Sequence, residues 1–117
     1  MAVRAESAAA LGELAPGAEL WDFGHVGDCG LHLSVLFPTE LGPVPPAVPA
    51  AVRRRFDEIV AAHGGSYSAE HGLGPLNADR WLATTSPVEQ RVIAALKSVL
   101  DPYRILGHPG HPYNRLP

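Results

Sequence analysis

"FGHVGDCGLHLSVLF", residues 23–37, decides the fold of this chain, because it joins a tight turn to a strand. Three glycines between residues 24 and 30 allow the backbone to turn sharply. The next seven residues alternate in polarity, and one face collects the apolar side chains Leu31, Leu33, Val35 and Phe37. We expect that face to pack against the core. His32 and Ser34 therefore point to the opposite face.

The segments on either side of this turn predict an α+β fold with an antiparallel sheet. Residues 18–24, "AELWDFG", are typical of the partner strand, and the alanine-rich residues 2–14 indicate a short helix. An amphipathic helix is predicted over 50–63, with its apolar stripe formed by Val52, Phe56, Ile59 and Val60. Gly64 and Gly65 are typical of a left-handed helix end.

A further helix is predicted from "SPVEQRVIAALKSVLDP", residues 86–102. Ser86 is suited to the N-cap, Pro87 to the first helical position, and Glu89 completes a capping box. Its apolar stripe, which we expect to be buried, consists of Val88, Val92, Ile93, Leu96, Val99 and Leu100. We interpret Trp21 and Trp81 as packing anchors. Residues 76–83 predict one or two further helical turns.

The composition of the chain indicates a single globular domain and excludes several classes of partner. The 117 residues are 46% hydrophobic and 18% charged, with a net charge of -3. This charge gives no electrostatic reason to expect nucleic acid. No apolar run reaches membrane-spanning length, and one cysteine, Cys29, excludes an internal disulfide. We expect a cytoplasmic protein.

Four ionisable side chains in glycine-rich segments are the candidate site residues: His25, His32, Glu70 and His71. Two histidines with one carboxylate form a ligand set typical of open catalytic sites for zinc and similar ions. In an extended segment Glu70 and His71 point to opposite sides, so His71 is left to move protons. On spacing alone, structural roles remain open: a turn cap for His25, a half-buried side chain for His32, a helix-adjacent acid for Glu70 and a surface position for His71.

Three stretches of the chain resemble, in the same order, those of the FAD-linked oxidase C-terminal domain family. Residues 23–35 are similar to GHxGDGNLHLN, residues 63–74, "HGGSYSAEHGLG", to HGGxISxEHGxG, and residues 95–110 to IKxxLDPxxxLNPG. The resemblance extends from Trp21 to Gly110. The family includes D-lactate dehydrogenases, the FAD subunit of glycolate oxidase and D-2-hydroxyglutarate dehydrogenases.

The resemblance implies a partial ferredoxin-like cap domain that helps FAD oxidise a 2-hydroxy acid by hydride transfer. It places His25, His32 and Glu70 at the family's divalent-metal ligands, with zinc as the expected ion, and His71 at the catalytic base. Ser34 stands on the substrate side, where the family has an asparagine. Cys29-Gly30 replaces the family's Gly-Asn, and "HPGH" at 108–111 departs from Asn-Pro-Gly-Lys. These departures leave the ligand positions intact and the substrate open.

Nothing in the chain resembles the family's larger N-terminal flavin-binding domain. We therefore expect residues 1–117 to be the C-terminal portion of an oxidase, either truncated or split from a flavin-binding partner. Such a chain would hold FAD poorly and be inactive alone. Two alternatives remain open: a metal-dependent hydrolase using the same His-His-Glu site, and a non-catalytic remnant whose exposed sheet edge pairs with a second copy.

Overall fold

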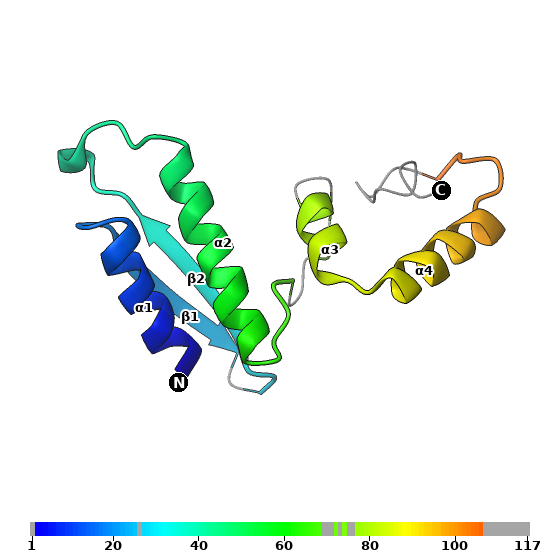
Figure 1. Cartoon of the computed structure of the whole chain (residues 1–117), viewed down its shortest axis with the longest axis horizontal. Helices are drawn as coiled ribbons and strands as arrows, with labels where there is room; N and C mark the ends of the chain where they lie inside the picture. The colour runs from blue at the N-terminus through cyan, green and yellow to red at the C-terminus, as the bar shows by residue number, and fades with distance from the viewer. Residues whose placement is uncertain (1, 26, 69–71, 73, 75–76, 107–117) are drawn as a thin grey trace. The chain divides into compact units, whose positions relative to one another are not determined.

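The structure, a computed structural model, describes residues 2–25, 27–68, 72, 74 and 77–106. It divides into two compact units, Met1–Ala69 and Glu70–Pro117, which we call unit 1 and unit 2. Figure 1 shows the elements of both units. Each unit is described by itself.

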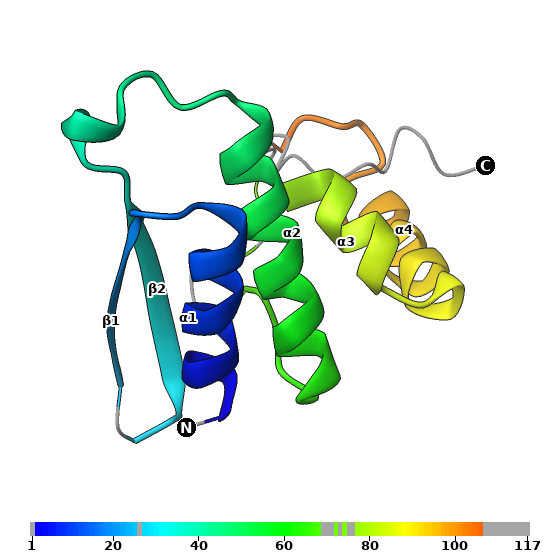
Figure 2. The same ribbon diagram turned by 60° about the vertical axis from the view of Figure 1, so that its left-hand side comes forward.

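Unit 1 is a helical layer on one face of a β-hairpin. Helix α1 (Ala2–Leu14) leads into the antiparallel strands β1 (Glu19–His25) and β2 (Gly30–Leu36). A short 3₁₀ helix, η1 (Thr39–Leu41), and a proline-rich connection precede α2 (Ala47–Ala62). Helices α1 and α2 lie side by side on the same face of the hairpin (Figures 1 and 2). The predicted α+β fold with helices on one face is confirmed.

The core of unit 1 lies between this layer and the inner face of the hairpin. Its buried centre is formed by Leu11 and Ala15 near the end of α1 and by Val52 of α2. The half-buried side chains packed against it are Ala18, Leu20, Val35, Phe37, Val48 and Phe56. Because Leu20 of β1 pairs directly with Val35 of β2, these two side chains share the inner face. The alternation predicted for residues 31–37 therefore gives the correct face.

The C-terminus of α2 ends in a Schellman motif. Gly64 has a φ of +69°, and its N–H donates to the carbonyl of Ala61 at 2.9 Å. The N–H of Gly65 donates to the carbonyl of Val60, also at 2.9 Å. The glycine pair thus terminates the helix as predicted, although α2 begins at Ala47, three residues before the expected start. Extra apolar residues in that first turn extend its contact with the core.

One ion pair connects the two layers of unit 1, and another connects the two helices. The Nε of Arg4 lies 2.7 Å from Oδ2 of Asp22, which joins α1 to β1. The Nε2 of His63 lies 2.9 Å from Oε1 of Glu6, which joins the end of α2 to α1. His63 thus ties the C-terminal end of α2 to α1.

Unit 2 consists of α3 (Ala78–Thr84) and α4 (Pro87–Leu100). The predicted capping box is present: the Glu89 N–H donates to Ser86 Oγ at 3.2 Å, and the Ser86 N–H donates to Glu89 Oε2 at 3.1 Å. The side-chain amide of Gln90 donates to the carbonyls of Leu82 and Thr85 at 3.2 and 2.8 Å. These bonds tie the start of α4 to the end of α3.

The predicted burial of the α4 stripe is wrong. No residue of α4 is buried, and Leu96 and Val99 expose 54% and 76% of their surface. A helical apolar period predicts burial only if another layer covers the stripe, and within the described residues of unit 2 no layer covers α4. Trp81, in α3, is buried as expected. Among the described helices, none is long and apolar enough to cross a membrane.

Candidate functional site

The face of the hairpin that points away from the core, which we call the outer face, carries the candidate site residues of unit 1: His25, His32 and Ser34. The cross-strand pairs Trp21–Ser34 and Phe23–His32 place four side chains there, and His25 follows at the end of β1. The side chains on this face are those of Glu19, Trp21, Phe23, His25, His32, Ser34 and Leu36. Trp21 is 60% exposed, so its interpretation as a packing anchor is wrong. Its position on the face away from the helices explains the exposure.

Three aromatic rings meet on the outer face. The Phe23 ring is stacked on the His32 imidazole, with centroids 4.7 Å apart and planes at 5°. The His25 ring contacts His32 edge to face, with centroids 5.4 Å apart and planes at 63°. The register of the two strands therefore brings into contact two imidazoles separated by seven residues. Their convergence on one metal ion stays a prediction.

The turn between the strands is held by its own polar groups. Asp28 Oδ1 accepts the Gly30 N–H at 2.9 Å, and Asp28 Oδ2 lies 3.7 Å from His25 Nδ1. The Gly30 N–H, followed by the charge of His25, holds the pKa of the Asp28 carboxyl below its usual value. Cys29 has a φ of +61° and is exposed, so it occupies the turn position with the left-handed backbone.

Gly24 permits the close approach of the two strands beside this turn. A Cβ at this position would lie 2.1 Å from the backbone oxygen of Gly30, a distance that no side chain can occupy. The same atom added at Gly27 would meet nothing within 4 Å. Only glycine at position 24 therefore allows the hairpin to close directly before His25.

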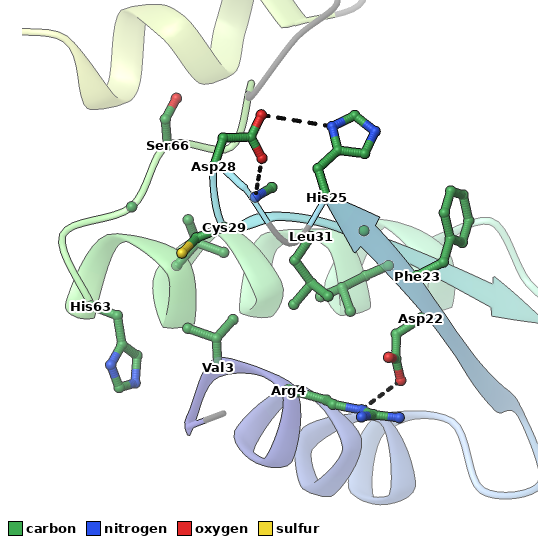
Figure 3. A pocket seen from close by; sticks show the side chains of 15 residues that line it. Val3, Arg4, Asp22, Phe23, His25, Asp28, Cys29, Leu31, His63 and Ser66 are labelled. Carbon is green, nitrogen blue, oxygen red and sulfur yellow. Dashed lines mark hydrogen bonds and ion pairs between the residues drawn. The ribbon is translucent and has the colours of Figure 1, made fainter.

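A pocket of about 900 Å³ lies at the turn end of the hairpin, among the hairpin, α1 and α2. Figure 3 shows its ionic groups: Arg4 reaches Asp22 below the strand, whereas Phe23 and His25 lie on the other side of β1. Because Arg4 and Asp22 neutralise each other at 2.7 Å, the pocket offers a ligand little unpaired charge from this pair. Of the predicted site residues, His25 lines this pocket, whereas His32 and Ser34 are not among its lining residues.

The remaining predicted site residues, Glu70 and His71, lie outside the described residues. The same is true of His108 and His111 in the C-terminal tail. Within the described part of the chain, no group of three His, Cys, Asp or Glu side chains could hold a metal ion. His25 and His32 supply two imidazoles, a donor type suited to zinc, and their rings contact each other on the outer face. Their role as metal ligands, together with Glu70, stays a prediction.

Sequence reasoning missed two residues that order the site, Phe23 and Asp28. The signal for Phe23 was the hairpin register. The length of the turn between the two strands sets which residues face each other, and it pairs residue 23 with residue 32. The signal for Asp28 was its place two residues before a glycine N–H, where aspartate often closes a turn through its side chain.

Comparison with known proteins identifies a family with the same motifs. The sequence model described as "FAD linked oxidases, C-terminal domain" matches residues 3–110. This match begins earlier than the resemblance at Trp21 and includes nearly all of α1.

The chain is also similar to curated proteins named D-2-hydroxyglutarate dehydrogenase. It is 38% identical over 108 residues to that of Stutzerimonas stutzeri, covering 87% of this chain and 22% of the relative. It is 36% identical over 110 residues to the mitochondrial protein of Arabidopsis thaliana, covering 91% and 18%. For the mitochondrial protein of Bos taurus, identity is 38% over 99 residues, covering 81% and 16%. The chain thus spans about a fifth of the length of these relatives.

Proposed function

The chain belongs to the family of FAD linked oxidases, C-terminal domain, and we propose that it forms the substrate-side segment of an FAD-dependent 2-hydroxy-acid dehydrogenase. The observation that carries this proposal is the contact between the His25 and His32 rings on the outer face of the hairpin. These are the two positions that the family motif assigns to metal ligands. The flavin would be supplied by a partner domain or subunit, since the chain corresponds to about a fifth of its relatives.

Each proposed residue has a distinct task in this reaction. His25 and His32, with Glu70, would hold a divalent ion, zinc by preference, whose chemistry is to lower the pKa of the substrate hydroxyl. His71 would accept the hydroxyl proton on an imidazole nitrogen, and a bound FAD would supply the hydride-accepting chemistry. Ser34, two residues after His32 on the same strand face, would donate or accept one hydrogen bond at the substrate.

The names of the relatives suggest the first substrate to test. Because the three similar proteins above are named for D-2-hydroxyglutarate, we propose a D-2-hydroxy acid, and that dicarboxylate first. The hydrolase alternative has no support from the family or its relatives, and we do not propose it. A cytoplasmic location stays a prediction.

Complementation would test the proposal. The Stutzerimonas stutzeri relative, with the segment matching this chain deleted, is co-expressed with the chain, and the complex is purified. We expect a flavin absorbance spectrum and anaerobic bleaching of the flavin by D-2-hydroxyglutarate. His71→Ala should keep the flavin and slow bleaching by about a hundredfold or more, as loss of a general base does. Absence of flavin from both the complex and the chain alone would contradict the proposal.

A non-catalytic association module is the second candidate, and the apolar outer face favours it. Phe23 and Leu36 expose 62% and 49% of their surface, and each described strand is an edge strand. Light scattering across a range of concentrations would distinguish the two functions. If metal-free chain forms oligomers and Trp21→Ser forms them equally well, the outer face is not the contact surface. That result would argue against this second candidate.

A further inference from the structure

We propose that Phe23 is a positioning residue that fixes the plane of the His32 imidazole before any ion binds. The inference rests on the proposed function, in which His32 is a metal ligand. It goes beyond it by assigning a role to a side chain that carries no ligand atom. The supporting observation is the parallel stack of the two rings, with centroids 4.7 Å apart and planes at 5°.

The stack is set by the hairpin itself. Phe23 and His32 are directly opposed in the register of β1 and β2, so their Cβ atoms leave the sheet side by side. Burial does not account for the orientation of Phe23, because 62% of its surface is exposed and its side chain lies on the face away from the core cluster. The contact that orients the Phe23 ring is therefore its stack on the His32 imidazole.

This arrangement restricts rotation of the His32 imidazole. Turning the His32 ring about its Cβ–Cγ bond would drive one edge into Phe23, which lies parallel to it. The His25 ring packs edge to face against His32, with planes at 63° and centroids 5.4 Å apart, and it hinders rotation of the His32 ring in a second direction. A ligand whose ring plane is already fixed loses less rotational freedom on binding an ion, and it therefore binds more tightly.

Three variants of the chain separate positioning from general packing. Phe23→Leu removes the ring but keeps an apolar side chain, and Phe23→Tyr keeps the ring. Trp21→Leu removes a different aromatic ring from the same face, opposite Ser34 rather than a histidine. His32→Ala removes the proposed ligand and shows the effect of losing it completely.

The first readout needs no metal. The ring protons of His32 should resonate upfield in the wild type, because they lie over the Phe23 ring. This shift should disappear in Phe23→Leu and persist in Phe23→Tyr and Trp21→Leu. An unshifted His32 spectrum in the wild-type chain would overturn the proposal at once.

The second readout is zinc affinity, measured by titrating ZnCl₂ into chelator-treated chain. Phe23→Leu should weaken binding by roughly three- to tenfold, near the lower end for residues that orient a ligand. Phe23→Tyr and Trp21→Leu should stay within about twofold, as surface substitutions do. Backbone amide spectra confirm that the hairpin register is intact in each variant.

Two failures can be told apart. If His32→Ala weakens zinc binding but Phe23→Leu does not, the positioning role is wrong and the proposed metal site stands. If His32→Ala leaves zinc binding unchanged, the metal site of the proposed function is wrong, and the role inferred for Phe23 falls with it.

Discussion

Unit 1 and unit 2 contain similar amphipathic helices but are stabilised in different ways. In unit 1, Leu11 and Val52 expose 2% and 3% of their surface because two helices and a hairpin enclose them. In unit 2, the apolar stripe of α4 is open, and the helix is held by a capping box and by the side chain of Gln90. The comparison teaches that an apolar period yields a core only where another layer faces it.

The largest test of this difference makes the same substitution in both units. Leu11→Ala should lower the free energy of unfolding of unit 1 by about 2–5 kcal/mol, because it removes a buried side chain and leaves a cavity. Leu96→Ala should cost about 0.5 kcal/mol or less, because that side chain is 54% exposed. Amide hydrogen exchange reports each unit separately. If both substitutions lowered the free energy of unfolding equally, α4 would be packed in solution and the two units would not differ in this way.

A second test concerns the backbone of unit 1. Gly24→Ala should cost about 1–3 kcal/mol by forcing the strands apart where backbone would meet the new methyl group. Gly27→Ala, three residues further along in open space, is the matched control and should change stability by less than about 0.5 kcal/mol. Ring-proton spectra of His25 and His32 should move in the first variant only. Similar spectra in both variants would mean that closure at Gly24 does not shape the site.

A third test concerns the local hydrogen bonds of unit 2. Ser86→Ala should destabilise α4 by about 1 kcal/mol, since it removes the N-cap acceptor of the Glu89 N–H. Ser98→Ala, on the exposed side of the same helix, removes only a hydroxyl that donates to the Ala94 carbonyl and should cost much less. Faster exchange of the first-turn amides in Ser86→Ala alone would sharpen the contrast between the units. No difference between the two serines would indicate that packing, rather than capping, holds α4.

The smallest effect is a pH dependence at the end of α4. The Asp101 carboxyl is bonded to the Lys97 ammonium, and Asp101 Oδ1 accepts the Ile105 and Leu106 N–H groups at 2.9 and 3.3 Å. Lys97, followed by these N–H groups, lowers the pKa of Asp101.

A lowered folded-state pKa gives a stabilisation that is complete above about pH 4, the usual range of aspartate. It is lost as the pH falls through the lowered pKa, where the bound carboxylate takes up a proton. We expect the Ile105 and Leu106 amides to exchange faster there, after correction for intrinsic rates, and not to show this transition in Asp101→Asn. A transition that persists in the variant would assign it to another carboxyl group.

The hairpin and the caps were predictable because their signals are local. The alternation in residues 31–37, the Gly64-Gly65 helix end and the Ser86 capping box each depend on a few neighbouring residues, and each is present. The burial of the α4 stripe and of Trp21 was not predictable in this way. Burial depends on which surface covers a side chain, and that surface is remote in sequence or absent from the described residues.

The sequence by itself determined the elements of this protein, the inner and outer faces of its hairpin and its family, because backbone periodicity and ordered motifs are properties of short segments. Only the tertiary structure decided that the His25 ring contacts His32 and that Phe23 stacks upon it. The reason is the hairpin register: it pairs Phe23 with His32, nine positions apart in the chain, and one position of slip would have placed His32 on the opposite face from Phe23 and His25.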